Sequence, residues 1–399
     1  MDRTRVVYPL ASTTWDDLEI KAATRLLESN KLTMGAEVKT FEEDFARYSG
    51  TKFAVMFNSG SSANLGMLTA LRYQKNSTLR DGDEVIVPAV SWSTTYYPIN
   101  QAGLVIKFVD VNLETLNLDF DLVEQAITEK TKVILAVNLL GNPAELVRLK
   151  KLAEKHNLIL IEDNCESLGA EIEGEKAGTF GLAGSYSFFF SHHICTMEGG
   201  MVTTNSKEFA ETLISIRAHG WTRGLEKENS VHPKSDNEWE DLFRFVLPGY
   251  NLRPIELSGA IGQVQLSKFP KFLEWRQTNA SHFQKLFENR EDVLIQQEHG
   301  SSSWFGFSMI LQGKLIGRRQ ELVEHFAERG IETRPIVAGN FTQNPVMKHL
   351  DHAVVPKLPN SELLHTEGFF IGNHHTDFRT ELDKVFEVFI SFVEGQVNG

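Results

Sequence analysis

Two adjacent histidines, His192 and His193, stand in the segment 187–200, which reads SFFFSHHICTMEGG. A histidine side chain exchanges protons near neutral pH, so either could act as a general acid or base. Neighbouring side chains of an extended chain point to opposite faces, and we therefore expect at most one to enter a given pocket. The alternative is that both are structural residues. A metal role would need further ligands, which the local sequence does not supply.

Two other polar segments follow predicted strands and could bind a flat, phosphorylated ligand. In NSGSSANL (residues 58–65), Gly60 and Ser61 at a helix start could hold a phosphate through backbone N–H groups and the helix dipole. An ordinary N-cap and turn is the alternative. Trp92 could stack on a heteroaromatic ring, or it could simply pack the loop in which it lies.

Acidic residues end a third strand, whose segment 158–167 reads LILIEDNCES. Burying Asp163 or Glu166 there is costly unless the carboxylate has a positive or hydrogen-bonding partner. A pyridinium nitrogen is one such partner, and the pairing keeps the ring electron-withdrawing. The alternative is an acid that caps the next turn.

The elements that must position these residues alternate between strands and helices. Such alternation predicts an α/β fold in which helices cover both faces of a mostly parallel sheet. The polar turns that follow the first, second and fifth strands should meet in one crevice at the carboxyl ends of the strands. The predicted strands are 52–57, 83–89, 105–111, 132–141 and 158–167, and the predicted helices are 13–29, 38–50, 58–74, 94–103, 120–129 and 144–157.

The pattern changes near residue 256, which predicts a large domain over 1–255 and a smaller α+β domain over 256–399. A helix beginning at Glu256 should break at Pro270 and resume afterwards. The polar, turn-rich stretch 225–242 looks like an excursion from the main fold.

Composition excludes several classes of function. The 399 residues carry a net charge of −13 and no run dense in lysine and arginine, so no nucleic-acid partner is expected. Two cysteines, Cys165 and Cys195, exclude a disulfide framework and a cluster held by four cysteines. The N-terminus has no signal-peptide pattern, and no apolar stretch reaches about 18 residues. We expect a cytoplasmic protein with no membrane partner and no metal site.

Taken in order along nearly the whole chain, these motifs resemble the family of sugar aminotransferases that act on nucleotide-linked 4-keto sugars, within the fold-type-I, aspartate aminotransferase-like class. The matching segments are SGSSANL, VPAVSWSTTYYP, EDNCESLGA, SFFFSHHICTMEGG, RAHGW, PGYNLRP and RPIVAGNF. The resemblance implies pyridoxal phosphate as cofactor. It also implies a homodimer in which each active site takes residues from both subunits.

One departure from the family pattern concerns the lysine that normally binds the cofactor covalently, six residues before the glutamate of the E-G-G ending. Here Glu198 is that glutamate and His192 occupies the lysine position, while the nearest lysines are Lys176 and Lys207. An imidazole forms no stable imine, so the resemblance implies a cofactor, in its pyridoxal or pyridoxamine form, that is bound non-covalently. It implies that His192 is the catalytic base.

The same substitution marks a branch of the family, the 3-dehydratases of 4-keto-6-deoxy sugar nucleotides. One kind carries an iron–sulfur cluster and needs a reductase, which two cysteines cannot support. Resemblance to the other kind implies a GDP-linked 4-keto-6-deoxymannose substrate, L-glutamate as amino donor, and release of ammonia and 2-oxoglutarate. The alternatives are a 4-aminotransferase, or an inactive relative that only binds cofactor or nucleotide sugar.

The resemblance also assigns binding roles residue by residue. Asn251 is expected to reach the cofactor phosphate from the partner subunit. The cofactor-binding residues implied are Gly60, Ser61, Trp92, Asp163, Glu166, Ser187 and Asn251. The substrate-binding residues implied are Lys31, Leu32, Thr33, Met34, His219, Arg223, Arg253 and Glu332, with His219 for glutamate and the others for the nucleotide sugar.

Overall fold

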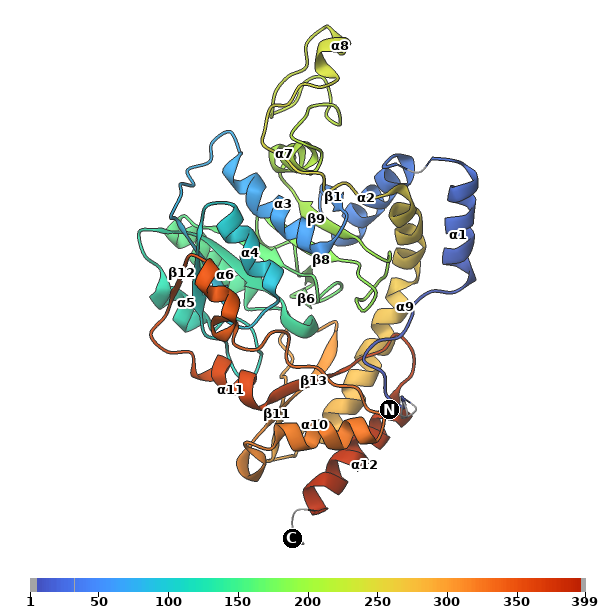
Figure 1. Ribbon diagram of the computed structural model, residues 1–399, viewed down its shortest axis with the longest axis vertical. Coiled ribbons are helices and arrows are strands. Elements are labelled where there is room, and N and C mark those ends of the chain that lie inside the picture. Colours follow the sequence, from blue (N-terminus) through green and yellow to red (C-terminus); the bar gives the residue numbers. More distant parts are fainter. Residues whose placement is uncertain (1–5, 32, 396–399) are drawn as a thin grey trace.

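The computed structural model describes residues 6–31 and 33–395, and its centre is an eight-stranded sheet (Figure 1). The strand order is β1-β9-β8-β5-β4-β2-β3-β12, and β9 alone runs antiparallel to its neighbours in this sheet. The strands are β1 (Phe53–Phe57), β2 (Glu84–Pro88), β3 (Val105–Val109), β4 (Thr131–Val137), β5 (Ile159–Asp163), β8 (Ala183–Ser187), β9 (Gly200–Thr204) and β12 (His352–Val354). The predicted α/β class with a mostly parallel sheet is therefore confirmed.

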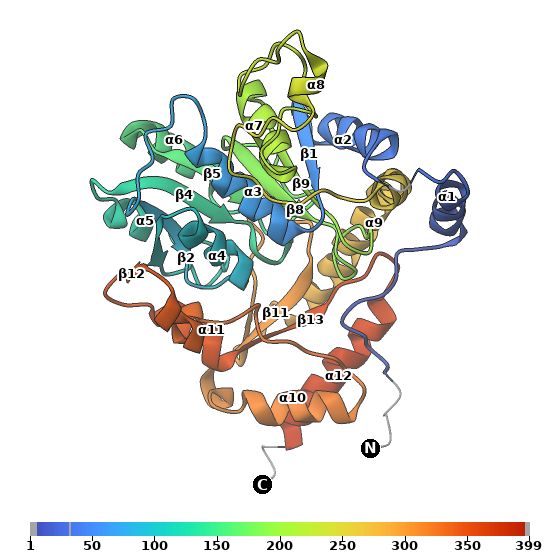
Figure 2. The ribbon, with the colours of Figure 1, turned by 45° about the horizontal axis from the view of Figure 1, so that its top comes forward.

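Helices cover both faces of this sheet because successive strand side chains alternate between two cores. Val85 and Val87 pack in one core with α3 (Gly60–Arg72), α4 (Ser93–Gln101) and α7 (Lys207–Arg217). Ile86 packs on the opposite face with α5 (Phe120–Ala126) and α6 (Leu146–His156). Figure 2 shows the sheet between these two groups of helices. The five strands and six helices expected up to residue 167 are all present, including α1 (Asp17–Glu28) and α2 (Ala36–Ser49).

A second, three-stranded antiparallel sheet lies below the first in Figure 1 and has its own apolar core. Its strands are β10 (Val293–Ile295), β11 (Gly306–Leu311) and β13 (Gly368–Gly372). The core is completed by α9 (Glu256–Phe287), α10 (Arg319–Glu328) and α12 (Arg379–Gly395). The remaining elements are β6 (Glu171–Ile172), β7 (Glu175–Lys176), α8 (Glu238–Asp241), α11 (Pro359–Glu367) and the 3-10 helices η1 (Leu139–Gly141), η2 (Gly313–Leu315), η3 (Phe341–Gln343) and η4 (Pro345–His349).

Two segments cross the boundary expected between residues 255 and 256. Strand β12 pairs with β3 in the large sheet, and Tyr8 packs in the core of the smaller sheet. Division into domains 1–255 and 256–399 stays a prediction.

The expected break of the helix at Pro270 is wrong, because α9 is a single helix of 32 residues and Pro270 lies inside it. Pro270 lies on the exposed side of α9, where water can hydrogen-bond the carbonyl that proline leaves without a donor. The first half of α9 packs against α1 and α2, and the second half packs against α12. Tertiary packing on both halves keeps the helix continuous.

The polar stretch 225–242 projects from the body of the molecule, at the top of Figure 1, and contains the short helix α8. Within residues 6–31 and 33–395, none of the helices combines the length and the apolar character that a membrane crossing requires.

Candidate active site

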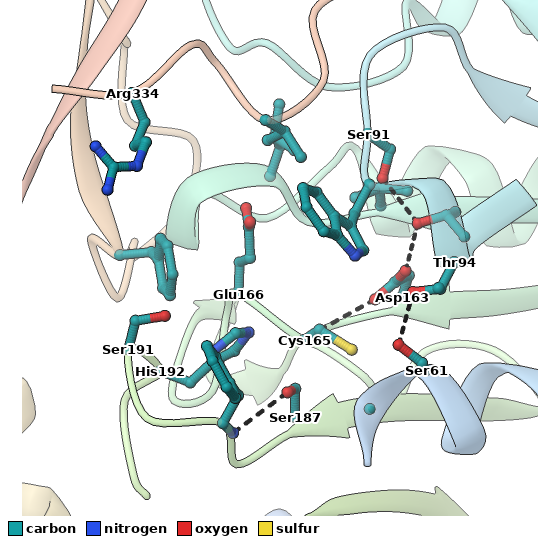
Figure 3. A pocket seen from close by; sticks show the side chains of 18 of the residues that line it. Ser61, Ser91, Thr94, Asp163, Cys165, Glu166, Ser187, Ser191, His192 and Arg334 are labelled. Atoms are coloured by element: carbon teal, nitrogen blue, oxygen red, sulfur yellow. Dashed lines mark hydrogen bonds between the residues drawn. The ribbon is translucent and has the colours of Figure 1, made fainter. Parts of the chain in front are cut away.

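A cavity of about 720 Å³ opens at the carboxyl ends of β1, β2, β5 and β8 (Figure 3). The turns after β1, β2 and β5 all contribute to its lining, as the alternation of strands and helices predicted. The C-terminal part of the chain closes another side through Phe370 of β13 and through three loop residues, Phe305, Glu332 and Arg334.

The start of α3 forms one end of the cavity and has the features of an anion site. Ser59 caps the helix, its Oγ accepting from the Ser62 N–H at 3.1 Å. A Cβ on Gly60 would lie 2.5 Å from Ser187 Cβ and 3.1 Å from Cys165 Sγ, so glycine alone permits this approach. Ser61 Oγ donates to Thr94 Oγ1 at 3.0 Å. The positive end of a helix dipole therefore lies beside Ser187 in the cavity.

Asp163 lies buried on the cavity floor and is held by three donors. Its Oδ2 accepts from Asn64 Nδ2 and from Thr95 Oγ1, both at 2.8 Å. Its Oδ1 accepts from the Cys165 N–H at 3.2 Å. Each oxygen of a carboxylate accepts about two hydrogen bonds, so Oδ1 keeps acceptor capacity toward the cavity.

Trp92 is the N-cap residue of α4, and its side chain lines the same cavity. The residue is 58% exposed, which leaves the indole free to stack on a planar ligand. Glu332 lines the cavity as well, and its Oε2 accepts from the Leu10 N–H at 2.8 Å.

The two adjacent histidines separate as predicted, although the premise of an extended chain is wrong. The His192 N–H donates to the Phe189 carbonyl at 2.9 Å, which places the pair in a turn. His192 lines the cavity, with its ring edge-to-face with Phe189 and Phe305 at centroid distances of 6.1 and 5.2 Å. His193 is buried outside it, and its Nε2 lies 3.1 Å from the Ser303 carbonyl oxygen.

Two titratable groups of the cavity have shifted pKa values. Burial, with a smaller contribution from the positive charge of Arg276, lowers the pKa of His192 to about 4. Burial raises the pKa of Glu166 to about 7, and the Asp163 charge adds to the rise. A hydrogen bond from the Leu140 N–H to Glu166 Oε2 at 2.9 Å acts in the opposite direction. His192 is therefore neutral at pH 7, and Glu166 is poised to exchange a proton there.

The other site residues expected from the sequence lie elsewhere in the chain. A second cavity of about 1030 Å³ is lined by Thr33, Met34, Arg223, Asn251 and Arg253. Backbone bridges connect Thr33 with Ile255 and Ala218 with Asn251. Both arginines lie over the Trp221 ring, with Cζ 5.5 and 5.7 Å from its centroid. We call Thr33, Met34, Arg223, Asn251 and Arg253 together the Arg223–Arg253 cluster.

Two of the remaining three expected residues line neither cavity, and the third falls outside the described residues. Lys31 is exposed, and His219 sits beside Trp221 with their ring centroids 5.3 Å apart. Leu32 lies outside the described residues. A single chain thus brings together Gly60, Ser61, Trp92, Asp163, Glu166, Ser187, His192 and Glu332, and it places the other expected residues apart.

Sequence reasoning missed several residues of the first cavity. Asn64 follows Gly60 by four positions and so shares its helix face, a signal that could have found it. Thr95 lies three residues after Trp92 in the motif VPAVSWSTTYYP, and Arg334 lies in the segment RPIVAGNF. Phe305 carries no local signal, because its place beside His192 depends on folding across more than a hundred residues.

Among the described residues that line the first cavity there is no lysine. Nor does the described part of the chain gather three or more histidine, cysteine or acidic side chains in a way that could hold a metal ion.

Residues 14–389 match the DegT/DnrJ/EryC1/StrS aminotransferase family. The chain belongs to this family. It is 50% identical to GDP-4-keto-6-deoxy-D-mannose 3-dehydratase of Yersinia pseudotuberculosis, over 97% of this chain and 99% of that protein.

Solved structures of this aminotransferase family extend the similarity to three dimensions. The Escherichia coli GDP-4-keto-6-deoxy-D-mannose 3-dehydratase with bound hydrated pyridoxal phosphate is 51% identical, with a TM-score of 0.95 over 96% of this chain and all of that one. A GDP-4-keto-6-deoxymannose 3-dehydratase structure with a trapped adduct of pyridoxal phosphate and glutamate is also 51% identical. Its TM-score is 0.93, over 96% of this chain and 99% of that one.

Proposed function

We propose that this chain is a pyridoxal-phosphate-dependent 3-dehydratase of GDP-4-keto-6-deoxy-D-mannose. It takes its amino group from L-glutamate and yields GDP-4-keto-3,6-dideoxy-D-mannose, 2-oxoglutarate and ammonia. The observation that carries the proposal is the lining of the first cavity, which His192 shares with Asp163 and Trp92 and which, among the described residues, contains no lysine. Identity of 50% over nearly the full length of a 3-dehydratase supports the same conclusion.

The residues of this cavity fit the cofactor. Gly60, at the positive end of α3, and Ser187 would bind the phosphate, because the glycine brings the helix start against the serine. Trp92 would stack on the pyridine ring, and Asp163 would accept from its ring nitrogen. When bound, pyridoxal phosphate supplies an electron sink beside the reacting carbon atoms. Since no lysine is among the described residues that line the cavity, non-covalent contacts would hold the cofactor.

His192 is proposed as the group that moves protons. Because its pKa is about 4, the imidazole is neutral at pH 7 and ready to accept a proton. Edge-to-face packing with Phe189 and Phe305 fixes the ring and makes the surrounding wall apolar. Glu166, with a pKa of about 7, is a second group within the cavity that can hold or release a proton.

Charge balance supports a homodimer with shared active sites. The first cavity is lined by four carboxylates, Asp163, Glu166, Glu198 and Glu332, against one arginine, Arg334. A cofactor phosphate and a nucleotide diphosphate need more positive charge than this chain offers there. The Arg223–Arg253 cluster has such charge and lies in a different cavity of the same chain. A second copy would complete the site by bringing this cluster, which includes Asn251, to the first cavity.

Product analysis tests the function directly. The full-length protein is incubated with pyridoxal phosphate, L-glutamate and GDP-4-keto-6-deoxymannose, without a reductase, and the sugar and ammonia are analysed. The expected products are a 3-deoxygenated sugar and ammonia. An amino sugar would identify a 4-aminotransferase instead, and binding without turnover would identify an inactive relative.

The adjacent histidines provide a matched pair of variants. His192→Asn should abolish deoxygenation, whereas His193→Asn should leave the cavity lining intact, since its ring lies outside it. Equal losses in both variants would contradict the role given to His192. A cytoplasmic location, expected from the sequence, stays a prediction.

A further inference from the structure

Arg276 lies buried in α9, beside Phe305, which lines the candidate site, and Trp304, which packs in the core of the smaller sheet. Arg276 is 4% exposed, and its Nε has no hydrogen-bond acceptor among residues 6–31 and 33–395. Its Nη1 donates to the carbonyls of Trp304 and Phe305 at 3.3 and 3.2 Å. Within the described residues it forms no ion pair with a carboxylate, so a full positive charge is buried against neutral acceptors. Such burial is costly, and the contacts that offset it all involve one short segment.

That segment, residues 303–305, is held from two directions. From η1, the Gly141 and Leu140 carbonyls accept from the N–H groups of Ser303 and Phe305, both at 2.9 Å. From the opposite direction come Arg276 and the Asn373 side chain, whose Nδ2 donates to the Trp304 carbonyl at 2.8 Å. Trp304 has a φ of +47°, a left-handed conformation that side-chain-bearing residues rarely adopt. The bonds on both sides keep this strained backbone in place.

The 303–305 segment supports both histidines of the turn. Phe305 packs edge-to-face on the His192 ring at 5.2 Å and lines the cavity. The Ser303 carbonyl oxygen lies 3.1 Å from His193 Nε2. Arg276 is therefore connected to His192 through two carbonyl hydrogen bonds and one aromatic contact.

The positive charge of Arg276 reaches the same imidazole. After burial, it is the second cause that lowers the pKa of His192, and it acts in the same direction on His374 and His375. On the wall side, the charged or titratable groups around His192 are Arg276 and His193. On the cavity side they are Asp163, Cys165, Glu166, Glu198, Glu332 and Arg334. Of these charges, that of Arg276 acts on the pKa of His192, and it favours the neutral ring.

We propose that Arg276 is a positioning residue for His192: its buried guanidinium fixes the 303–305 segment that carries Phe305, and it places a permanent positive charge behind the imidazole. The charge favours the neutral ring, which is the form able to accept a proton. This inference rests on the proposed function, because it concerns the group that moves protons there.

Two variants separate the charge from the hydrogen bonds. Arg276→Gln removes the charge but keeps an amide that can donate to the carbonyls, whereas Arg276→Lys keeps the charge and loses the planar fork. Lys271→Gln is the matched control, because Lys271 lies exposed on the same helix, where solvent screens its charge. The side-chain titration of His192 is followed by NMR in full-length protein labelled with ¹³C-histidine. His192→Asn identifies its signal.

The His192 midpoint should rise from about 4 toward 6.5 in Arg276→Gln, without reaching 6.5 because burial is the larger cause. It should stay unchanged in Arg276→Lys and in Lys271→Gln. An unchanged midpoint in Arg276→Gln, or equal rises in the glutamine and lysine variants, would overturn the proposal. If Arg276→Gln fails to fold, Arg276→Lys still tests the proposal. A raised titration midpoint of His192 in that variant, which keeps the charge, would refute the electrostatic role.

The pH dependence of turnover connects the titration to the reaction. If the midpoint rises to about 5, the neutral fraction of His192 at about pH 4.5 falls about threefold, and the acid limb of the activity profile should move up by the same pH interval, about one unit. The NMR titration needs no turnover, so failure of the proposed reaction and failure of the Arg276 role are distinguishable.

Discussion

Removal of the two side-chain donors to Asp163 should show how strongly the fold holds this carboxylate. Asn64 connects Asp163 to Ser185: it donates to Asp163 Oδ2 at 2.8 Å and accepts from Ser185 Oγ at 2.6 Å. All three residues are buried. Thr95 Oγ1 makes the second side-chain bond to the same Oδ2 and lies 2.8 Å from Ser91 Oγ.

Asn64→Ala removes one hydrogen bond to a charged group, worth about 1.5–3 kcal/mol. It also removes two neutral bonds, from Ser185 Oγ and to the Thr94 carbonyl, worth about 1 kcal/mol each. We therefore expect Asn64→Ala to lower the free energy of unfolding by about 3.5–5 kcal/mol. Thr95→Val removes one charged and one neutral bond and should lower it by about 2.5–4 kcal/mol. In the double variant Asp163 Oδ2 has no side-chain donor. The free energy of unfolding that the double variant loses should exceed the sum of the two single losses by about 1 kcal/mol, because a buried acceptor is left unsatisfied.

The assay is urea unfolding without added cofactor at one fixed protein concentration, followed by titration with pyridoxal phosphate. Thr222→Val is the matched control, because the Thr222 hydroxyl is buried without a hydrogen-bond partner among the described residues. It should be neutral or stabilising. Affinity for the cofactor should fall in Asn64→Ala and stay unchanged in the control. A loss below about 0.5 kcal/mol in Asn64→Ala, or equal effects of Thr95→Val and Thr222→Val, would refute the reasoning.

Three further predictions follow from the geometry. If active sites are shared between subunits, mixing the impaired variants His192→Asn and Arg253→Ala should restore about a quarter of full activity, since half of the dimers gain one intact site; no recovery would place Arg253 in the site of its own chain. Gly60→Ala puts a Cβ 2.5 Å from Ser187 Cβ, and it should cost about 1–3 kcal/mol in urea unfolding and weaken pyridoxal phosphate binding at least about tenfold; unchanged binding would contradict the phosphate site. Burial lowers the pKa of His374 to about 3, so the unfolded chain takes up its proton first and stability falls as the pH drops from about 6.5 toward 3. Between about pH 6 and 4 this loss of stability amounts to about 2.5 kcal/mol. His374→Gln should be spared this part of the decline, and the same decline in both proteins would refute the prediction.

Much of the site could be predicted because its signals are local in the chain. Alternating strands and helices are apparent from apolar periodicity, and in a mostly parallel sheet the carboxyl ends of strands meet at one edge. That rule predicts that Gly60, Trp92 and Asp163 lie together, and all three line one cavity of the folded chain. The spacing from His192 to the E-G-G ending is also local, and it places a histidine where the family has a lysine.

Other features depended on contacts between distant parts of the chain. Continuity of α9 through Pro270 follows from packing on both of its halves, which no local pattern reveals. Separation of the Arg223–Arg253 cluster from the first cavity is likewise a property of the folded chain.

The sequence by itself determined which residue types are available at the site: a histidine in place of a lysine, a carboxylate at a strand end and a glycine at a helix start. Only the tertiary structure decided the environment of that histidine. Phe305, the strained Trp304 and the buried Arg276 come from segments more than 80 residues away, and they determine its burial and its charge surroundings. The physical reason is that residue types and spacing are encoded locally, whereas desolvation and electrostatic fields depend on every group that folding brings near.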